Sequence, residues 1–400
     1  MQQTVMILDG GSGACLIRAG MPKGVCPEAW AAENPEALKE LQRNYVAAGS
    51  DAICTFTFGA NRAKLASHGL ADKCAELNEK LAAISKEASG GIALVGGDIG
   101  PTGLLPKPFG DTDFDTFYTI FAEQAKALEK GGADYITIET MMSLTEAKAA
   151  LLAAKAVTDL PVYVSMTCNE NGRTLSGCSP AAALVTLQAN GATAFGLNCS
   201  LPPDKMFPLF DPLLKVAKIP LTAKPNGEYP APDGSRHFVD PDTFAEQMKD
   251  FADAGVVALG GCCGSEPEHI SALSCLLFGA AVNPPYCAEE FLAIEKEIFT
   301  IPDEATVSAC GIYTPDAIFD AVDAEESVIR VQIDSPADAE TLFDMLVYAN
   351  APISIVASDV EAALRTAGIC PARFLLDPAS SIAEEDKLKL TRRLFAAAKQ

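Results

Sequence analysis

The sequence predicts an α/β fold, a (β/α)8 TIM barrel followed by a small C-terminal α/β module. Two observations predict the barrel. Four helical tails each end in a glycine that leads into an apolar strand, at Gly49, Gly132, Gly191 and Gly255. Glycine just past a helix marks its C-terminal end, and an apolar strand after it suits a parallel sheet covered on both faces. Eight expected strands precede residue 265, and eight β/α units in about 280 residues match the size of this barrel.

The expected strands follow one another along the chain, separated by helical patterns such as PEALKELQRNYVAAG (35–49) and DTFAEQMKDFADAG (242–255). In order, they are TVMILDG (4–10), DAICTFTF (51–58), IALVGGDIG (92–100), DYITIET (134–140), PVYVSMTC (161–168), ATAFGLNCS (192–200), IPLTAKPN (219–226) and VVALGGCCG (256–264).

An open, doubly wound sheet with a bound nucleotide is the alternative, and DGGSGACLIRAG (9–20) carries two glycines of a dinucleotide loop. That loop needs a third glycine where this chain has Leu16. A flexible turn from strand to helix accounts for the segment, so we expect no nucleotide site.

We expect the barrel to occupy residues 1–288 and the C-terminal module residues 289–400, with Pro284 and Pro285 near the boundary. The module shows three apolar strand patterns, VIRVQID (328–334), PISIVAS (352–358) and RFLLDP (373–378), with helical stretches between them. It contains no histidine-centred or glycine-rich cofactor motif, and the sequence indicates no role for it.

Composition limits the partners and the compartment. The net charge of −23 and the lack of a lysine or arginine cluster disfavour nucleic-acid binding. The 13 cysteines, odd in number and irregular in spacing, are typical of reduced thiols. No apolar run reaches the ~18 residues of a membrane helix, and the N-terminal residues lack the pattern of a signal peptide. We therefore expect a cytoplasmic protein that does not contact a membrane.

The reacting groups of a TIM barrel lie at the C-terminal ends of its strands. In strand order, these ends carry Asp9-Gly10-Gly11; Thr55, Thr57 and Asn61; Asp98; Glu139-Thr140; Ser165 and Thr167; Asn198-Cys199-Ser200; Lys224 and Asn226; and Cys262-Cys263.

Three of these residues, Cys199, Cys262 and Cys263, predict a metal site. Adjacent residues have Cα atoms about 3.8 Å apart, whereas disulfides span roughly 4.4–6.8 Å, so we set aside a bond between Cys262 and Cys263. Strands six and eight lie two apart around the barrel, which places all three thiols at one rim. Three thiolates favour a soft metal ion, foremost Zn²⁺, and three protein ligands leave its fourth position open, as in catalytic zinc sites.

Zinc that carries three thiolates is a weak Lewis acid toward water. Its natural use is to bind a substrate thiol and hold it as the thiolate, which is the form that attacks electrophiles. The cysteine set therefore predicts alkylation of a thiol, most simply methyl transfer to sulfur, with the same three cysteines as catalytic residues.

An amino-acid thiol also needs its charged ends held. Glu139 suits the ammonium group, and Asp9 with the backbone N–H groups of Gly10 and Gly11 suits the other end. Two alternatives stay open: Glu139 caps the following helix, and Asp9 bonds its own turn.

Several segments resemble the homocysteine S-methyltransferase family, especially the homocysteine-binding barrel of cobalamin-dependent methionine synthase. They are ILDGGSGACL (7–16), YVAAGSDAICTFTFGANRAKL (45–65), DYITIETMMSLTEAKAAL (134–151), GLNCS (196–200) and ALGGCCG (258–264). The resemblance implies that the three cysteines bind zinc and that homocysteine is held by Glu139 and the turn at Asp9 and Gly10. Gly11, Thr57 and Asn198, at the same rim, complete the expected substrate-binding set.

The resemblance leaves the methyl donor open. The corrinoid module of the full enzyme carries a D-x-H-x-x-G motif that this chain lacks, and the C-terminal module is too short for a complete pterin barrel. We favour a separate methyl-corrinoid protein that docks on the barrel mouth. A methylsulfonium such as S-methylmethionine and methylfolate from another subunit are the other options.

Two other interpretations stay open. In the first, the barrel is a non-catalytic zinc-binding subunit whose tail and acidic surface serve a partner. In the second, it is a lyase or aldolase in which Lys224 forms a Schiff base.

Overall fold

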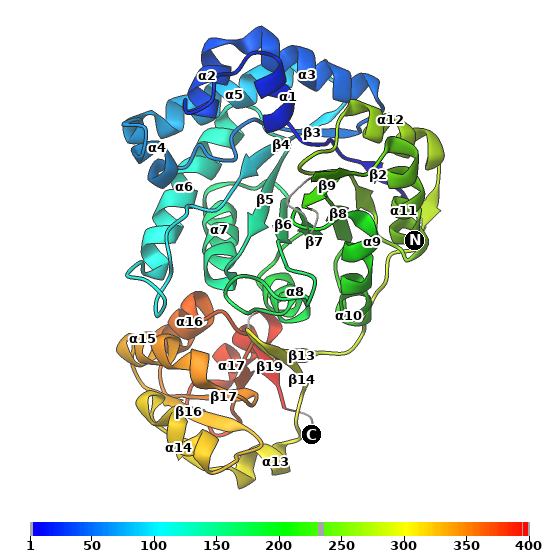
Figure 1. Ribbon diagram of the computed structural model, residues 1–400. Coiled ribbons are helices and arrows are strands. Elements are labelled where there is room, and N and C mark those ends of the chain that lie inside the picture. Colours follow the sequence, from blue (N-terminus) through cyan, green and yellow to red (C-terminus); the bar gives the residue numbers. More distant parts are fainter. Residues whose placement is uncertain (1–2, 231–235, 394, 399–400) are drawn as a thin grey trace.

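The computed structural model describes residues 3–230, 236–393 and 395–398. Eight parallel strands form one sheet that curls into a barrel, with helices around it (Figure 1). Asp51 N donates to Ile7 O at 2.7 Å, which joins the last strand of the sheet to the first. The sheet order is β2 (Met6–Ile7), β11 (Ala258–Leu259), β8 (Leu221–Lys224), β7 (Ala194–Asn198), β6 (Val162–Met166), β5 (Tyr135–Met141), β4 (Leu94–Ile99) and β3 (Ala52–Cys54).

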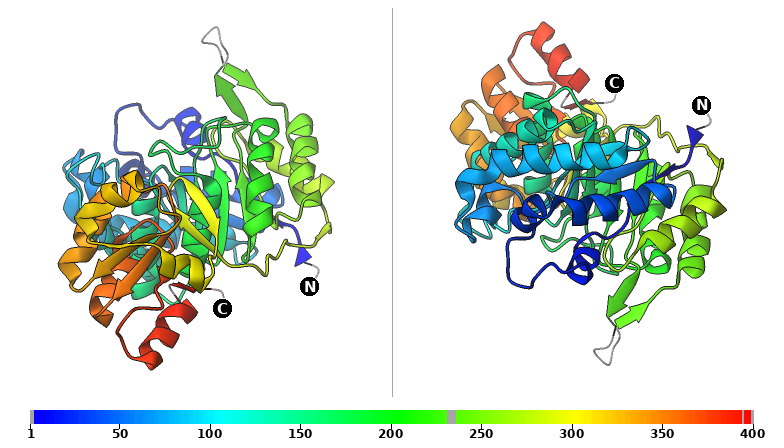
Figure 2. Two further views of the ribbon diagram at one scale, coloured as in Figure 1. Left: turned by 90° about the horizontal axis from the view of Figure 1, so that it is seen from below. Right: turned by 90° about the horizontal axis from the view of Figure 1, so that it is seen from above.

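The strand patterns of the sequence are thus confirmed, and so is the predicted (β/α)8 barrel. Two short pairings add to it: β1 (Gln3–Thr4) pairs with β12 (Ala281–Val282), and β9 (Glu228–Pro230) pairs with β10 (Arg236–Phe238). The second pair leaves the barrel just after β8 and projects from it (Figure 2).

The helices of the barrel begin where capping residues and prolines predict. The Asp113 side chain accepts from Thr116 N at 2.8 Å, and the Ser179 side chain accepts from Ala182 N at 3.1 Å. The helices are α1 (Gly13–Arg18), α2 (Pro27–Glu33), α3 (Pro35–Ala47), α4 (Arg62–Ala66), α5 (Cys74–Ser89), α6 (Phe114–Lys130), α7 (Leu144–Val157), α8 (Pro180–Ala189), α9 (Pro203–Met206), α10 (Asp211–Val216), α11 (Pro241–Asp253) and α12 (Pro267–Leu276).

The C-terminal module contains a five-stranded parallel sheet. Its strands run in sequence order as β15 (Ile312–Tyr313), β16 (Ile329–Ile333), β17 (Ile353–Ala357), β18 (Leu375–Leu376) and β19 (Ala396–Ala397). The sequence patterns located β16, β17 and β18 and missed the two edge strands, which are only two residues long. The helices are α13 (Glu304–Ala309), α14 (Ile318–Asp323), α15 (Pro336–Met345), α16 (Val360–Ile369) and α17 (Glu384–Arg393).

A hairpin of β13 (Phe291–Ile294) and β14 (Glu297–Thr300) lies between the two sheets and packs on α8 (Figure 1). This explains why α8, PAAALVTLQA, is apolar on every side: the barrel covers one face and the hairpin covers another. We propose that the chain divides after residue 288, because β12 still pairs with β1, which directly precedes the first barrel strand, and β13 pairs with its own hairpin partner.

Lys148 of α7 joins the module to the barrel. Its side chain is fully buried, and Nζ donates to Ala367 O at 2.5 Å and Cys370 O at 2.6 Å, at the C-terminal end of α16. A lysine suits this place because the last carbonyls of a helix lack partners within the helix. On the surface nearby, Arg365 pairs with Asp115 through two contacts of 2.8 Å. The module therefore packs beside the N-terminal ends of α6 and α7, which face the C-terminal ends of the barrel strands.

Within the described residues, the structure holds no helix that combines the length and the apolar character needed to cross a bilayer.

Candidate functional site

The structure brings the three predicted cysteines together at the C-terminal ends of the strands. The sulfurs of Cys199, Cys262 and Cys263 all lie within 4.8 Å of one another, and the Cys199 and Cys263 sulfurs are 3.8 Å apart. Cys199 follows β7 directly, and both it and Ser200 have φ of 62°, so the strand turns abruptly there. Left-handed backbone at non-glycine residues carries a cost that is often found at functional sites.

The side chains of Cys262 and Cys263 lie on the same side of the barrel mouth because a tight turn follows β11. Ser265 N donates to Cys262 O at 3.1 Å, which closes a turn over residues 262–265. Gly264 lies within it at φ of 77°, a conformation that glycine adopts without penalty. The two adjacent thiols can therefore approach the same point, which a straight strand would prevent.

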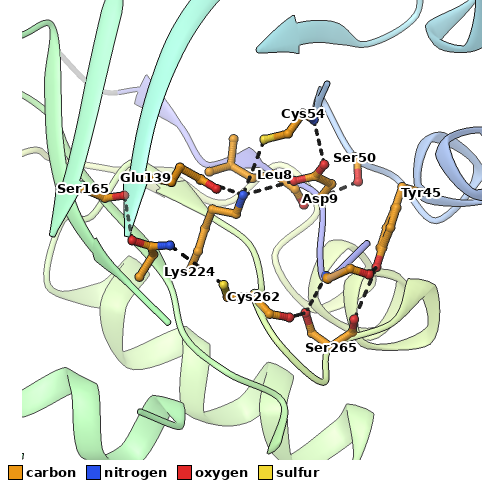
Figure 3. Close-up of polar contacts among 12 residues, drawn as sticks. Leu8, Asp9, Tyr45, Ser50, Cys54, Glu139, Ser165, Lys224, Cys262 and Ser265 are labelled. Carbon is orange, nitrogen blue, oxygen red and sulfur yellow. Dashed lines mark hydrogen bonds and ion pairs between the residues drawn. The ribbon is translucent and has the colours of Figure 1, made fainter. Parts of the chain in front are cut away.

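The turn that follows β2, at Gly10 and Gly11, packs against the turn over residues 262–265. A Cβ added at Gly11 would lie 2.6 Å from Cys262 O, so only glycine permits this approach. Gly11 N donates to Ser265 O at 3.1 Å, and the Tyr45 hydroxyl donates to Gly11 O at 2.8 Å (Figure 3). The expected anion nest at Gly10 and Gly11 therefore needs correction: the Gly11 N–H is already used inside the protein.

The thiols influence one another's protonation. Hydrogen bonds from the thiols of Cys199 and Cys262 lower the pKa of the Cys263 thiol well below its ordinary value. The same neighbours, Cys199 first, together with burial, raise the pKa of the Cys262 thiol.

A cavity of about 590 Å³ opens beside the cysteines. This is within the usual range for small-molecule sites. Its lining joins the ends of seven barrel strands, with Asp9, Gly10, Gly11, Cys54, Thr55, Asp98, Glu139, Thr140, Cys199, Lys224, Cys262 and Cys263 among the residues.

Lys224 holds two carboxylates at the base of this cavity (Figure 3). Its Nζ lies 2.8 Å from Glu139 Oε1, 3.2 Å from Asp9 Oδ1 and 3.5 Å from Cys54 Sγ. Burial opposes the charge on the ammonium group, but Cys54, Glu139 and Asp9 outweigh it and raise the pKa of Lys224 well above its ordinary value. A lysine that keeps its proton is a poor nucleophile, which argues against a Schiff base at this residue.

Glu139 faces the cavity because β5 bulges at its end. The register with β6 shifts between Ile138 and Met141, and Thr140 has φ of 60°. Such bulges redirect a side chain. The following helix, α7, is capped instead by the Ser143 side chain, so the alternative role of Glu139 as a helix cap is wrong.

Asp9 does not bond its own turn. Its Oδ2 accepts from Cys54 N of β3 at 2.7 Å, while its Oδ1 faces Lys224. The carboxylate thus links the first two strands of the barrel and helps to hold the lysine.

Thr57 and Asn198 are not among the residues that line the cavity. The Thr57 hydroxyl donates to Asp98 O at 2.7 Å. Asn198 Oδ1 accepts from Thr140 N at 2.8 Å and from Ser165 Oγ at 2.9 Å, and its Nδ2 donates to Thr140 Oγ1 at 2.7 Å. Both side chains hold the strand ends in place.

Sequence reasoning placed Asp98 and Lys224 at strand ends without giving either a substrate-binding role. Their position at the C-terminal ends of strands was the available signal. The sequence could not show that Lys224 contacts Asp9 and Glu139, because these two residues lie on strands far from Lys224 along the chain.

The family model for homocysteine S-methyltransferase matches residues 6–277. The chain belongs to the homocysteine S-methyltransferase family. It is 32% identical over 290 residues to the methionine synthases of Mycobacterium tuberculosis (strain ATCC 25618 / H37Rv) and Mycobacterium leprae (strain TN), matching 68% of this chain and 24% of either relative. The chain therefore spans about a quarter of the length of these relatives.

Solved structures support the fold of this family member. The homocysteine methyltransferase MmuM from Escherichia coli, in its metallated form, aligns with a TM-score of 0.60 at 22% identity. Its oxidised form aligns with a TM-score of 0.59 at the same identity. Each alignment covers 68% of this chain and 96% of the other. The C-terminal module lies outside the residues that the family model matches.

Proposed function

We propose that this barrel is a zinc-dependent methyltransferase that moves a methyl group to the thiol of homocysteine and yields methionine. One observation carries the proposal: three cysteine sulfurs from two separate loops lie within 4.8 Å of one another beside a cavity that also contains buried carboxylates. Family membership supports the reaction class.

The donor set fits zinc. Cys199, Cys262 and Cys263 supply three soft thiolate ligands, and the adjacent cavity gives a substrate access to a fourth position. The metallated form of the Escherichia coli relative supports a metal in this fold. When bound, zinc lowers the pKa of a substrate thiol so that the thiolate forms near neutral pH.

The residues of the chain hold the rest of the substrate. The cluster of Asp9, Glu139 and Lys224 has one carboxylate more than its single ammonium group neutralises, so it attracts the substrate ammonium group. Glu139 Oε1 is engaged by Lys224, and the other carboxylate oxygen is left for the substrate. The cluster and the three cysteines line the same cavity, so a homocysteine anchored by its ammonium group lies beside the cysteines.

The methyl transfer forms one bond and breaks one. The thiolate sulfur attacks the methyl carbon, the bond from that carbon to the donor breaks, and its electron pair leaves with the donor. The proton of the thiol passes to solvent. We propose that the donor is a methyl-corrinoid or methylfolate supplied in trans, with S-methylmethionine as the alternative.

Methionine formation tests the proposal. The zinc-loaded protein is incubated with homocysteine and, separately, methylcobalamin, methylfolate and S-methylmethionine, and methionine is measured by mass spectrometry. We expect methionine with at least one donor and none with the Cys262→Ser variant. Stoichiometric zinc without methionine from any donor would favour a non-catalytic subunit.

A further inference from the structure

Asp98, at the end of β4, is a carboxyl of the site with no assigned role, whereas Glu28 and Glu228, which also line the cavity, contact Gly59 N and Arg236. Its side chain is only 7% exposed and lines the cavity beside Glu139. Among the residues that the structure describes, Asp98 Oδ1 is buried without a hydrogen-bond partner. A buried carboxyl oxygen left in this state costs free energy, so it points to a missing ligand.

Lys224 is not available to satisfy Asp98. An ammonium group has three hydrogens to donate, and those of Lys224 face Glu139, Asp9 and Cys54. Three carboxyl groups, those of Asp9, Glu139 and Asp98, thus lie near one lysine, and the lysine has no hydrogen left to donate to Asp98.

The surroundings of Asp98 favour its neutral form. Burial is the main cause, and Glu139 of β5 adds to it, so the pKa of Asp98 lies well above its ordinary value. Asp9 and Glu28 act in the same direction, while Lys224 opposes them. A neutral carboxylic acid has an O–H group and can donate a hydrogen bond, which a carboxylate cannot.

The charge of an amino-acid substrate fits this arrangement. Asp9 and Glu139 leave one negative charge after Lys224 is paired, and that charge matches the substrate ammonium group. The substrate carboxylate then needs donors, and the Gly11 N–H expected for it is used by Ser265. Ionised Asp98 would repel that carboxylate, whereas protonated Asp98 supplies a donor.

We propose that Asp98 is a substrate-binding residue that, as a protonated carboxylic acid, donates a hydrogen bond to the α-carboxylate of the bound amino-acid thiol. This inference rests on the proposed function. In this arrangement two carboxyl groups recognise the substrate: ionised Glu139 binds the ammonium group, and protonated Asp98 binds the carboxylate.

Three thiol compounds test the recognition of the ammonium group and of the carboxylate independently. Homocysteine carries both charged groups, 4-mercaptobutanoate lacks the amino group, and 3-mercaptopropylamine lacks the carboxylate. Binding of each is measured by calorimetry with zinc-loaded wild type, Asp98→Ala and Asp98→Asn, after metal content and thermal melting have shown that each variant is folded and loaded.

We expect Asp98→Ala to weaken the binding of homocysteine and 4-mercaptobutanoate about 10- to 150-fold, the range of one hydrogen bond to a charged group. The affinity for 3-mercaptopropylamine should stay within about twofold, because that thiol has no group for Asp98 to hold. Asp98→Asn should recover part of the loss, since an amide N–H also donates. The affinity of Asp98→Asn for homocysteine should fall less steeply at alkaline pH than that of the wild type, because only the substrate ammonium group and not residue 98 then loses a proton.

Three outcomes would overturn the inference. A loss confined to 3-mercaptopropylamine would show that Asp98 binds the ammonium group as a carboxylate. An equal loss for all three thiols would show a purely structural role, and so would Asp98→Asn binding no better than Asp98→Ala. If the zinc-loaded wild type binds none of the thiols, the proposed function itself fails and the inference with it, a result that cannot be confused with the other three.

Discussion

Replacing Glu139 with glutamine tests how the cavity holds its substrate. Glu139 is 7% exposed, and Oε1 accepts from Lys224 Nζ at 2.8 Å. The amide oxygen of glutamine can still accept from the lysine, so the barrel should fold. The variant loses the negative charge that is offered to the substrate ammonium group. A hydrogen bond between charged groups contributes about 1.5–3 kcal/mol, which corresponds to a roughly 10- to 150-fold rise in the Kd for homocysteine.

The assay is calorimetric titration of homocysteine into zinc-loaded protein, together with metal analysis. Zinc content should not change, because Glu139 contributes no ligand to the cysteine cluster. Glu146→Gln is a matched control: Glu146 is equally buried, but it holds Thr102 N at 2.7 Å and Thr102 Oγ1 at 2.6 Å, away from the cavity. A Kd within twofold of wild type for Glu139→Gln, or a comparable rise for Glu146→Gln, would refute the reasoning.

Two further predictions concern the metal and the module. Cys262→Ser should lose most bound zinc and all methyl transfer while its Tm stays close to that of wild type, because the ligand lies on a rim loop outside the core; stoichiometric zinc by metal analysis would contradict this. Burial lowers the pKa of Lys148 from 10.5 to about 8, so the folded protein binds this proton less readily than the unfolded chain does. The contribution of Lys148 to stability should therefore be least favourable below pH 8 and should rise by up to about 1.4 kcal/mol per pH unit between pH 8 and 10.5. Denaturant titrations at several pH values give the free energy of unfolding as a function of pH. Between pH 8 and 10.5 this free energy should rise less steeply with pH for Lys148→Met than for wild type, and an identical rise in both proteins would count against a buried titrating lysine.

The sequence by itself determined the strands, most of the helices and the rim that carries the chemistry. Glycine after a helix and an apolar run after glycine are local signals, and a closed parallel barrel then places every strand end at one mouth. Cys199 and the pair Cys262 and Cys263 could be expected to meet because that geometry is shared by all such barrels. The edge strands β15 and β19 were not predicted: the first is a short run bounded by Gly311 and Pro315, and the alanines of the second are typical of helices.

Only the tertiary structure decided how the polar groups are shared. Asp9 and Lys224 are 215 positions apart along the chain, and Lys148 lies 222 positions from Cys370, yet each pair is in contact. The same holds for the Gly11 N–H, which Ser265 occupies, and for Asn198, whose amide is used by Thr140 and Ser165. The residue type fixes how many hydrogen bonds a side chain can make, but its partners are set by the packing of distant segments, and those partners decide which groups are left for a substrate.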